Sequence, residues 1–188
     1  MNKRNIRPTR ILWVDLEMTG LEPAKDLILE VAAEVTDFDL KTLATYEQSI
    51  KHPKELVVKR MQKNSWWQDF PHNRDQFVKN LDNGKSILAV EQELIELVDK
   101  HFTNEMAILG GNSIYNDRLF IKQWMPNLDL KLHYRMLDVS AWKIFMHGKH
   151  NISFKKPEVH RAFEDIQGSI AELQYYLEWF SKNKENDA

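Results

Sequence analysis

The sequence contains no cysteine among its 188 residues. Without a thiol the chain has no disulfide, no thiolate nucleophile and no cysteine ligand for zinc. Any metal ion must therefore be bound by oxygen atoms or by imidazole. Glycine and proline are also scarce, with six of each, which leaves little material for a long linker. We expect one domain over residues 1–188, with a basic tail at 1–10 and a frayed end at 181–188.

Long apolar runs are missing as well. No run approaches the roughly 20 residues that a membrane-spanning helix requires. The N-terminal segment, MNKRNIRPTR, is basic but is not followed by an apolar stretch of the signal-peptide type. We therefore expect a cytoplasmic protein without a membrane partner. The basic residues of this segment form either a phosphate-binding patch or a solvated tail, and we favour the tail.

A large excess of charge is absent too, since 26 basic residues face 28 acidic ones and the formal net charge is −2. Binding along a long nucleic acid depends mainly on the neutralisation of many phosphates. The charge balance therefore argues against a protein that coats long nucleic acid. It leaves a short anionic substrate open.

The most informative stretch is ILWVDLEMTG, residues 11–20. Its first four apolar residues predict a strand that is buried on both faces. Asp15 and Glu17 follow, and because side chains alternate along a strand, these carboxylates point the same way about 7 Å apart. Two like charges beside an apolar core require a cation. The alternative interpretation is an edge strand with a solvated acidic face.

The rest of the pattern predicts an α/β fold, with a mixed sheet and helices on both faces. Strands at 28–36 and 43–50 form an antiparallel meander, and the segment 51–85 holds short helices whose limits the pattern does not fix. Ser86 caps a helix that runs to about residue 102. The later predicted elements are a strand at 106–109, a helix at 115–125 stopped by Pro126, a strand and a helix within 134–146, a loop at 147–157 and a last helix from 159 to about 183.

Two further carboxylates stand near helix starts. Asp117 follows the run GGNSIYN, and Asp165 lies in the first turns of the last helix. With Asp15 and Glu17 they make an all-oxygen ligand set, which Mg²⁺ and Mn²⁺ prefer. Two such ions about 4 Å apart activate a water and stabilise the leaving oxygen of an in-line displacement at phosphorus. The set therefore predicts phosphodiester hydrolysis.

His160 precedes Asp165 by five residues. A histidine with an unperturbed pKa near 6.5 accepts a proton from water at neutral pH, which suits a general base. The alternative interpretation is a histidine that caps the helix or lies at the surface.

Four motifs taken together resemble the oligoribonuclease family, a member of the DEDDh group of 3′-to-5′ exonucleases: DLEMTGLEP, GNSIYND, HYRMLDVS and HRAFEDI. The likeness runs from about residue 11 to residue 180. It implies an RNase H-like exonuclease fold, a mixed five-stranded sheet flanked by helices, and a homodimer. The implied reaction releases 5′-mononucleotides from the 3′ end of RNAs of two to five nucleotides, dinucleotides above all, with two divalent ions.

The resemblance also implies roles for single residues. The implied metal ligands are Asp15, Glu17, Asp117 and Asp165, and the implied base is His160. Glu164 stands where relatives often have Asp, and we assign it a solvated role.

The implied substrate contacts come from several segments. Leu21 resembles the residue that wedges against the bases, and Tyr134 resembles its aromatic counterpart from the neighbouring subunit. Ser113, Arg135 and Ser140 are similar to the group that caps the 5′ phosphate, with Arg135 again crossing the dimer. A guanidinium fork suits that phosphate. Such a cap favours short substrates, because a longer chain must continue where the cap closes.

The segment from Trp66 departs from the family pattern. It reads WWQDFPHNRD, where the family usually carries His-Thr-x-Ser-Gly-Leu after a Trp. Either Trp66 or Trp67 stacks on a base, or both belong to the core. Ala141 stands where Thr is common, which removes one phosphate contact.

Three functions follow from these observations. The first is an oligoribonuclease. The second keeps the catalytic centre but acts on longer RNA or single-stranded DNA, and basic patches beside the site would favour it. The third is a non-catalytic RNA-binding or dimerising module, which loss of a carboxylate would have indicated. All four carboxylates are present, and no basic patch stands out, so we favour the first.

Overall fold

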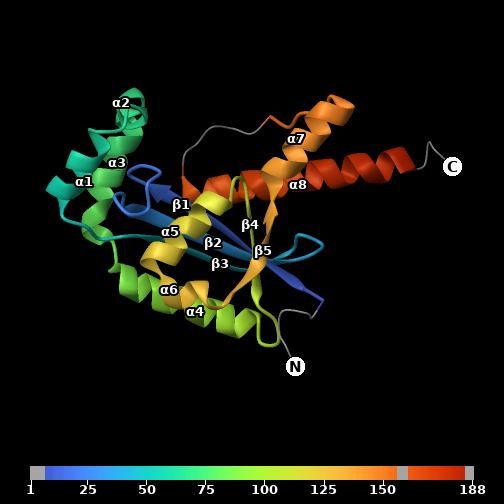
Figure 1. The fold of residues 1–188 in the computed structure, drawn as a ribbon, viewed down its shortest axis with the longest axis horizontal. Coiled ribbons are helices and arrows are strands. Elements are labelled where there is room, and N and C mark those ends of the chain that lie inside the picture. The colour runs from blue at the N-terminus through green and yellow to red at the C-terminus, as the bar shows by residue number, and fades with distance from the viewer. Residues whose placement is uncertain (1–6, 156–160, 185–188) are drawn as a thin grey trace.

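The computed structural model describes residues 7–155 and 161–184, and a mixed five-stranded sheet lies at the centre of this part (Figure 1). The strands are β1 (Arg10–Met18), β2 (Ile28–Asp37), β3 (Thr42–Ser49), β4 (Ala107–Gly111) and β5 (Leu132–Asp138). Their order is β3-β2-β1-β4-β5. The pairs β1–β2 and β2–β3 are antiparallel, whereas β1–β4 and β4–β5 are parallel. The predicted mixed sheet and meander are confirmed, and the strand with the acidic pair is the central one.

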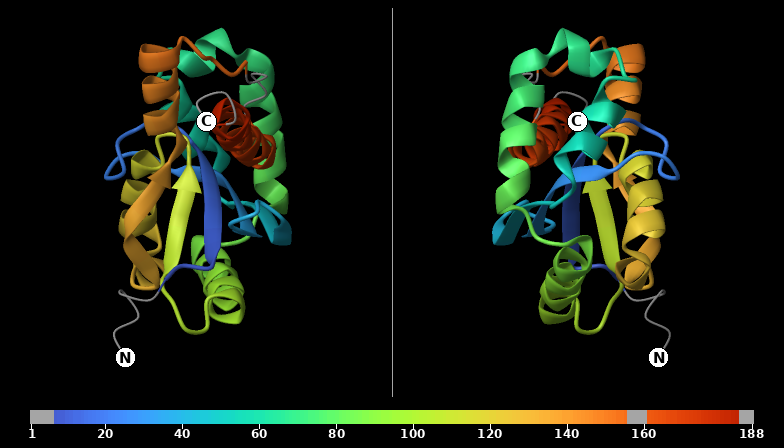
Figure 2. Two further views of the ribbon diagram at one scale, coloured as in Figure 1. Left: turned by 90° about the vertical axis from the view of Figure 1, so that its right-hand side faces the viewer. Right: turned by 90° about the vertical axis from the view of Figure 1, so that its left-hand side faces the viewer.

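Helices cover both faces of the sheet. They are α1 (Lys54–Met61), α2 (Trp66–Asp69), α3 (Pro71–Asn80), the 3₁₀ turn η2 (Leu81–Asn83), α4 (Ile87–His101), α5 (Tyr115–Trp124), α6 (Pro126–Asp129), α7 (Val139–His150) and α8 (Ala162–Lys184). Figures 1 and 2 show α4 and α8 on opposite sides of the sheet. Helices α1, α2 and α3 stand together at one end of the sheet, near the end of β1 (Figure 1). The short helices expected within 51–85 are these three.

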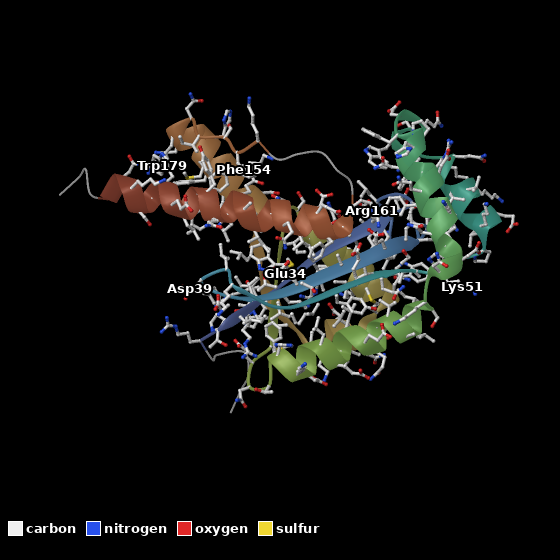
Figure 3. All side chains as sticks on the ribbon, turned by 180° about the vertical axis from the view of Figure 1, so that it is seen from behind. Glu34, Asp39, Lys51, Phe154, Arg161 and Trp179 are labelled. Carbon is white, nitrogen blue, oxygen red and sulfur yellow. The ribbon has the colours of Figure 1, made fainter. Side chains whose placement is uncertain are left out.

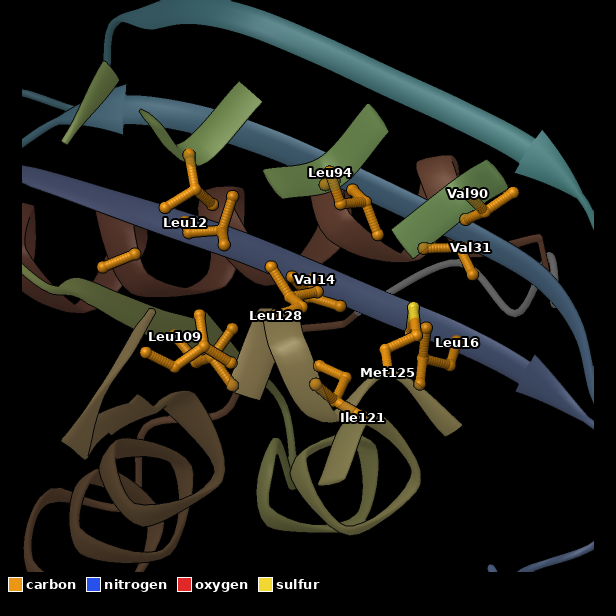
Figure 4. Close-up of a cluster of buried hydrophobic side chains, with 14 of the residues drawn as sticks. Leu12, Val14, Leu16, Val31, Val90, Leu94, Leu109, Ile121, Met125 and Leu128 are labelled. Atoms are coloured by element: carbon orange, nitrogen blue, oxygen red, sulfur yellow. The ribbon is translucent and has the colours of Figure 1, made fainter. Parts of the chain in front are cut away.

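One face of the sheet packs against α4, α5 and α6. Leu12, Val14 and Leu16 of β1 lie on this face, together with Val90 and Leu94 of α4 (Figure 4). All five side chains are buried, and burial of one aliphatic side chain of this size contributes about 1.5–3 kcal/mol. This layer fixes the orientation of β1.

The opposite face packs against α8. Ile11 and Trp13 are buried there with Ile166 and Ile170 of the helix. Because side chains alternate along a strand, the next odd-numbered positions of β1 face α8 as well. These positions carry the acidic pair. The fold therefore presents both carboxylates to the helix that carries the last one.

The ends of α4 and α5 lie where the sequence predicts them. The side chain of Ser86 accepts a hydrogen bond from the backbone N–H of Ala89 at 3.2 Å and caps α4. Pro126 follows the end of α5 as predicted, but it also starts the short helix α6. Proline is tolerated in a first helical turn, where its missing N–H has no partner to lose.

The predicted loop at 147–157 is wrong in its first part. Residues 147–150 continue α7, which is capped by Asn151 with a left-handed φ of 55°. The ring of His150 packs on Trp179 of α8, with the ring centroids 4.3 Å apart. A contact with a distant helix thus stabilises a turn whose own sequence, HGKH, has no apolar period.

The chain ends are described in part. Arg10, which we assigned to the tail, belongs to β1, and α8 begins at Ala162 instead of residue 159 and continues to Lys184. Residues 1–6, 156–160 and 185–188 lie outside the described ranges. Within those ranges, no helix combines the length and the apolar character needed to cross a membrane.

Candidate active site

Three carboxylates converge at the end of β1. Asp15 and Glu17 reach the site from the strand, and Asp165 reaches it from the first turns of α8. One oxygen of each lies within 4.8 Å of an oxygen of the other two, and all three residues are half-buried. Carboxylate oxygens at such separations suit a shared divalent ion, because Mg²⁺ and Mn²⁺ bind oxygen ligands and tolerate water in the remaining positions.

Asp117 lies directly beside this group. It is buried in the first turn of α5, and its Oδ1 accepts a hydrogen bond from the backbone N–H of Leu16 at 3.0 Å. Leu16 separates Asp15 from Glu17, so the carboxylate of Asp117 is held against the strand between the two. The structure therefore brings all four predicted acidic residues to one end of β1, three within 4.8 Å and the fourth adjacent to them.

The electrostatics of the site disfavour uncompensated negative charge. Burial, and after it the negative charges of Asp165 and Glu30, raise the pKa of Glu17 to about 8, with Arg161 opposing them. Burial also raises the pKa of Asp117 to about 7, against the backbone hydrogen bonds that stabilise its charged form. Crowded carboxylates with raised pKa values mark sites where a proton or a cation must compensate the charge.

A buried ion pair fixes the start of α8 near these carboxylates. Glu30 of β2 stands opposite Glu17 in the strand pairing, and its carboxylate accepts two hydrogen bonds from Arg161, at 3.1 and 2.7 Å. It also accepts the backbone N–H of Ala162 at 3.3 Å. Figure 3 shows Arg161 at the start of α8, the end of the helix that lies toward α1, α2 and α3.

Sequence reasoning missed this pair. Its signal is two glutamates, Glu30 and Glu34, inside an otherwise apolar strand, ILEVAAEV, and an arginine directly after the predicted base. A carboxylate that is only 1% exposed requires a partner, although the sequence does not say which of the many basic residues provides it.

A pocket of about 320 Å³ lies beside Glu17. Its lining residues are Leu16, Glu17, Met18, Gly20, Leu21, Asn64, Trp66 and Trp67. Leu21 is 71% exposed, whereas Trp67 is buried and donates its indole N–H to the carbonyl oxygen of Thr19 at 3.0 Å. Trp66 is half-buried and stacks on Phe70, with the ring centroids 4.7 Å apart. Trp67 thus belongs to the core, whereas the side chain of Trp66 is only half-buried.

A second cavity, of about 430 Å³, shares part of this lining. It contains three basic residues, Lys25, Arg60 and Lys63, and two acidic ones, Glu22 and Asp26. Lys25 pairs with Glu22 at 2.5 Å. Because the charges nearly cancel, this cavity is not a strongly basic track for a long nucleic acid.

Ser113 and Ser140 lie together at the surface. Their hydroxyl oxygens are 3.2 Å apart, and the backbone N–H of Ser113 donates to the Oγ of Ser140 at 2.9 Å. Asp138 at the start of α7 accepts both backbone N–H groups, at 3.0 and 2.9 Å. Ser113 has a left-handed φ of 50°, a conformation that costs free energy for a residue other than glycine. The hydrogen bonds to Asp138 and Ser140 stabilise this turn after β4.

Tyr134 and Arg135 lie on the edge strand β5. Tyr134 is 60% exposed, and the guanidinium of Arg135 lies 5.2 Å from the centre of its ring. In the part of the chain that the structure describes, neither residue lines the pocket beside Glu17. Both residues are exposed.

The predicted base, His160, lies outside the described residues, and its following neighbour is the arginine that pairs with Glu30. Glu164 is exposed on α8, in agreement with the solvated role predicted for it.

Comparison with known proteins gives concordant matches. Residues 12–173 match the family described as exonuclease, RNase T. A probable oligoribonuclease of Caenorhabditis elegans is 39% identical over 172 residues, which are 90% of this chain and 88% of that protein. Oligoribonucleases of Francisella tularensis subsp. tularensis (strain WY96-3418) and of Thiobacillus denitrificans are 37% and 36% identical over 168 and 179 residues. These alignments cover 88% and 93% of this chain and 93% and 97% of the relatives.

Solved structures show the same fold in more distant proteins. Exonuclease I from Methylocaldum szegediense superimposes with a TM-score of 0.62 at 12% identity, over 87% of this chain and 39% of that chain. Exonuclease I of E. coli in complex with a 5cy-dT13 oligonucleotide gives a TM-score of 0.58 at 14% identity, over 88% and 40%. This chain therefore spans about two fifths of the length of those structures. At such identities the likeness concerns the fold alone.

Proposed function

We propose a substrate and a mechanism for this chain, which belongs to the oligoribonuclease branch of the RNase T exonuclease family and is an oligoribonuclease-like 3′-to-5′ exonuclease. The proposed substrate is a short oligoribonucleotide of two to five nucleotides, a dinucleotide above all. The proposed products are 5′-mononucleotides. The observation that carries this proposal is the convergence of three carboxylates within 4.8 Å, beside a pocket of about 320 Å³ that suits a single base.

The acidic group is the proposed metal site. Asp15, Glu17 and Asp165 fit a divalent ion because they offer oxygen atoms only, and Asp117 completes the set for two ions. Bound Mg²⁺ or Mn²⁺ supplies the charge that activates a water and stabilises the negative charge that develops at phosphorus. In this proposal His160 accepts the proton of the attacking water, because a neutral imidazole is available at physiological pH.

The pocket beside Glu17 is the proposed site of the 3′ base. Leu21 projects from the turn after β1 and wedges between bases, and the half-buried Trp66, which lines the same pocket, stacks on a base. Tyr134 of a second subunit contacts the base from the other side. The exposure of Tyr134 on the edge strand supports this role.

The serine pair is the proposed site of the 5′ phosphate. Ser113 and Ser140 present neighbouring hydroxyls, and Arg135 of a second subunit provides the guanidinium fork. A closed site for the 5′ phosphate limits the length of the substrate. The nearly balanced charge of the 430 Å³ cavity that adjoins the pocket beside Glu17 supports the same limit.

Two of these roles require a homodimer. An apolar groove of about 600 Å³ between α7 and α8, lined by Ala141, Trp142, Phe145, Leu177 and Phe180, is the proposed contact surface. We further assign residues 1–188 to one exonuclease domain and the reaction to the cytoplasm. The absence of cysteine agrees with a reducing compartment.

A substrate comparison tests the proposal. Initial rates are measured in Mg²⁺ with a 5′-phosphorylated diribonucleotide, with an RNA of about 20 nucleotides and with single-stranded DNA of the same length. We expect the highest kcat/KM for the diribonucleotide. A higher value for the longer RNA or for DNA would favour the exonuclease of longer substrates instead, and no cleavage of any substrate would favour a binding module.

The variant Asp165→Asn tests the metal site. It keeps the shape of the side chain but removes a charged ligand, so we expect kcat to fall by about 10²–10³-fold or more with a melting temperature within a few degrees of the wild type. Glu164→Gln is the matched control, because this neighbouring carboxylate is exposed, and it should retain activity. Full activity of Asp165→Asn would remove Asp165 from the mechanism.

A further inference from the structure

The loop between β1 and β2, residues 19–27, carries the proposed wedge Leu21, and we call it the wedge loop. It contains no helix or strand, and the side chain of Leu21 is 71% exposed. Packing within the described part of the chain therefore gives this side chain little support. Its place at the pocket beside Glu17 must come from the way in which the backbone of the wedge loop is held.

Side chains of three helices hold the backbone of the wedge loop from outside. Each donates a hydrogen bond to a carbonyl oxygen of the loop, and the direction of each bond is fixed because indole and guanidinium nitrogens only donate. The pairs are Trp67 of α2 with Thr19 at 3.0 Å, Trp124 of α5 with Pro23 at 3.1 Å, and Arg60 of α1 with Lys25. The wedge loop is thus attached to α1, α2 and α5, at the end of β1 (Figure 1).

The carboxylate of Asp26 holds the wedge loop from inside. Its Oδ1 accepts the hydroxyl proton of the buried Thr19 at 2.9 Å, and its Oδ2 accepts the backbone N–H of Glu22 at 2.9 Å. A Cβ at Gly20 would lie only 2.6 Å from Oδ2 of Asp26, so the carboxylate packs directly on the glycine backbone. Asp26 therefore fixes the chain on both sides of Leu21.

We propose that Asp26 and Arg60 are positioning residues that hold Leu21 beside the pocket before the substrate binds. A loop that had to be ordered on binding would lower the apparent affinity by the fraction of time that it spends in the competent arrangement. In the described part of the chain, neither Asp26 nor Arg60 lines the pocket beside Glu17, so both act through the wedge loop. The inference rests on the proposed function, because it requires this pocket to bind the 3′ base and Leu21 to contact it.

The test measures how much the 3′ base contributes to cleavage, and we call this quantity the base ratio. It is kcat/KM for a 5′-phosphorylated diribonucleotide divided by kcat/KM for the same molecule without the base of its 3′ nucleotide. A variant that only lowers the folded fraction reduces both rates and leaves the base ratio unchanged. Leu21→Ala gives the reference, and we expect it to lower the base ratio by about tenfold, the order of one lost base contact.

Asp26→Ala is the test variant. It removes the acceptors of Thr19 and Glu22, so the wedge loop can leave the arrangement that places Leu21 at the pocket. We expect the base ratio to fall by about fivefold, the size typical of one lost hydrogen bond of this kind. Arg60→Met is a second variant in case Asp26→Ala does not fold. It keeps an apolar stem but loses the donor to Lys25, and we expect a smaller fall in the same direction.

Asp37→Ala is the matched control. Asp37 also holds a turn through its carboxylate, whose Oδ1 accepts the backbone N–H groups of Asp39 and Lys41 at 2.9 and 3.0 Å. Its turn lies at the opposite end of β1, because Asp37 pairs with Arg10 at the start of that strand. This variant should keep the base ratio of the wild type.

The double variant Leu21→Ala with Asp26→Ala shows whether Asp26 acts through the wedge. Without the leucine side chain its position no longer matters, so the double variant should have the base ratio of Leu21→Ala alone. A further fall in the double variant would show that Asp26 acts independently of Leu21, which overturns the inference.

The other outcomes separate the inference from the proposal beneath it. A wild-type base ratio near one, or no fall in Leu21→Ala, would remove the proposed base contact and the inference with it. A fall in Leu21→Ala that neither Asp26→Ala nor Arg60→Met shares would overturn the inference alone, as would an equal fall in the control. A fall in either test variant, with the control unchanged, supports it.

Discussion

At Glu17, burial and neighbouring charge act in the same direction. Burial, then Asp165 and Glu30, raise its pKa to about 8, while an isolated glutamate titrates near 4.5. A raised carboxyl pKa means that the folded chain holds a proton that the unfolded chain has released. The free energy of unfolding of the metal-free protein should therefore decrease as the pH rises from about 4.5 to about 8.

Metal binding should reverse this loss. A divalent ion binds the deprotonated carboxylate and has to compete with a proton at low pH. We expect Mn²⁺ to raise the melting temperature more at about pH 8.5 than at about pH 6. Thermal unfolding with and without Mn²⁺ at both values measures the effect.

The control for this prediction is Glu17→Gln. The variant has no proton to lose at this position, so its metal-free stability should depend less on pH in this window, and Mn²⁺ should stabilise it less. A Mn²⁺ effect of equal size at both pH values in the wild type would contradict the prediction.

The alternation of side chains made this part of the site predictable from the sequence. It placed Asp15 and Glu17 on one face of a strand, and the structure has them facing α8 with Asp165. The pairing of Glu30 with Arg161 was not predictable, since 131 positions separate the two residues. A single sequence indicates that a buried carboxylate needs a partner but not which one.

At the scale of elements, α8 is the helix whose position matters most for the site. Glu30 attaches its start to β2 through the guanidinium of Arg161 and the backbone N–H of Ala162. The guanidinium also lies 5.5 Å from the ring centre of Phe77 in α3. These contacts hold the start of α8 between β2 and α3. Asp165 follows in the first turns of the helix.

Glu30→Gln should loosen this attachment. Loss of one partner of a buried pair costs about 3–5 kcal/mol, and we expect about 2–3 kcal/mol here because the side chain of Arg161 is 29% exposed. We also expect a higher Mn²⁺ concentration for half-maximal kcat, since Asp165 is held less firmly. Urea unfolding and a Mn²⁺ titration of activity measure the two effects.

Glu34→Gln is the matched control on the same strand. Glu34 is also 1% exposed and also contacts α8, through Gln167, but its partners are neutral, including the hydroxyl of Thr42 at 2.6 Å. This variant should lose less stability and keep the Mn²⁺ requirement. An equal change of that requirement in both variants would show that Glu30 has no particular effect on Asp165.

The elements themselves were predictable to different degrees. Local signals such as Ser86 and Pro126 define helix ends, and the structure has α4 and α5 there. The final turn of α7 was not predicted, because it depends on the packing of His150 against Trp179. The limits of α1, α2 and α3 were not predictable either, because these helices are positioned by contacts with distant residues. Trp67 of α2, for example, donates a hydrogen bond to Thr19 and packs against Phe77 of α3.

At the scale of the whole molecule, exposed apolar surface gathers on α7 and α8. Phe145 is 47% exposed and Leu177 is 39% exposed, and both line the groove between the two helices. The edge strand β5, with Tyr134 at 60% exposure, is continuous in the chain with α7. Contiguous apolar surface of this kind marks interaction sites, and the proposed homodimer places a second copy of the chain there.

Phe145→Glu should therefore convert the dimer into a monomer, because it places a charge in the contact surface. We also expect kcat/KM for a 5′-phosphorylated diribonucleotide to fall by at least about tenfold, since Tyr134 and Arg135 would no longer reach the site of the other subunit. Sedimentation velocity and initial rates on the same samples measure both effects.

Leu88→Glu is the matched control, because Leu88 is 71% exposed on α4, across the sheet, and this variant should stay dimeric and active. A dimeric Phe145→Glu would move the interface away from the groove, and a fully active monomer would place Tyr134 and Arg135 outside the substrate site.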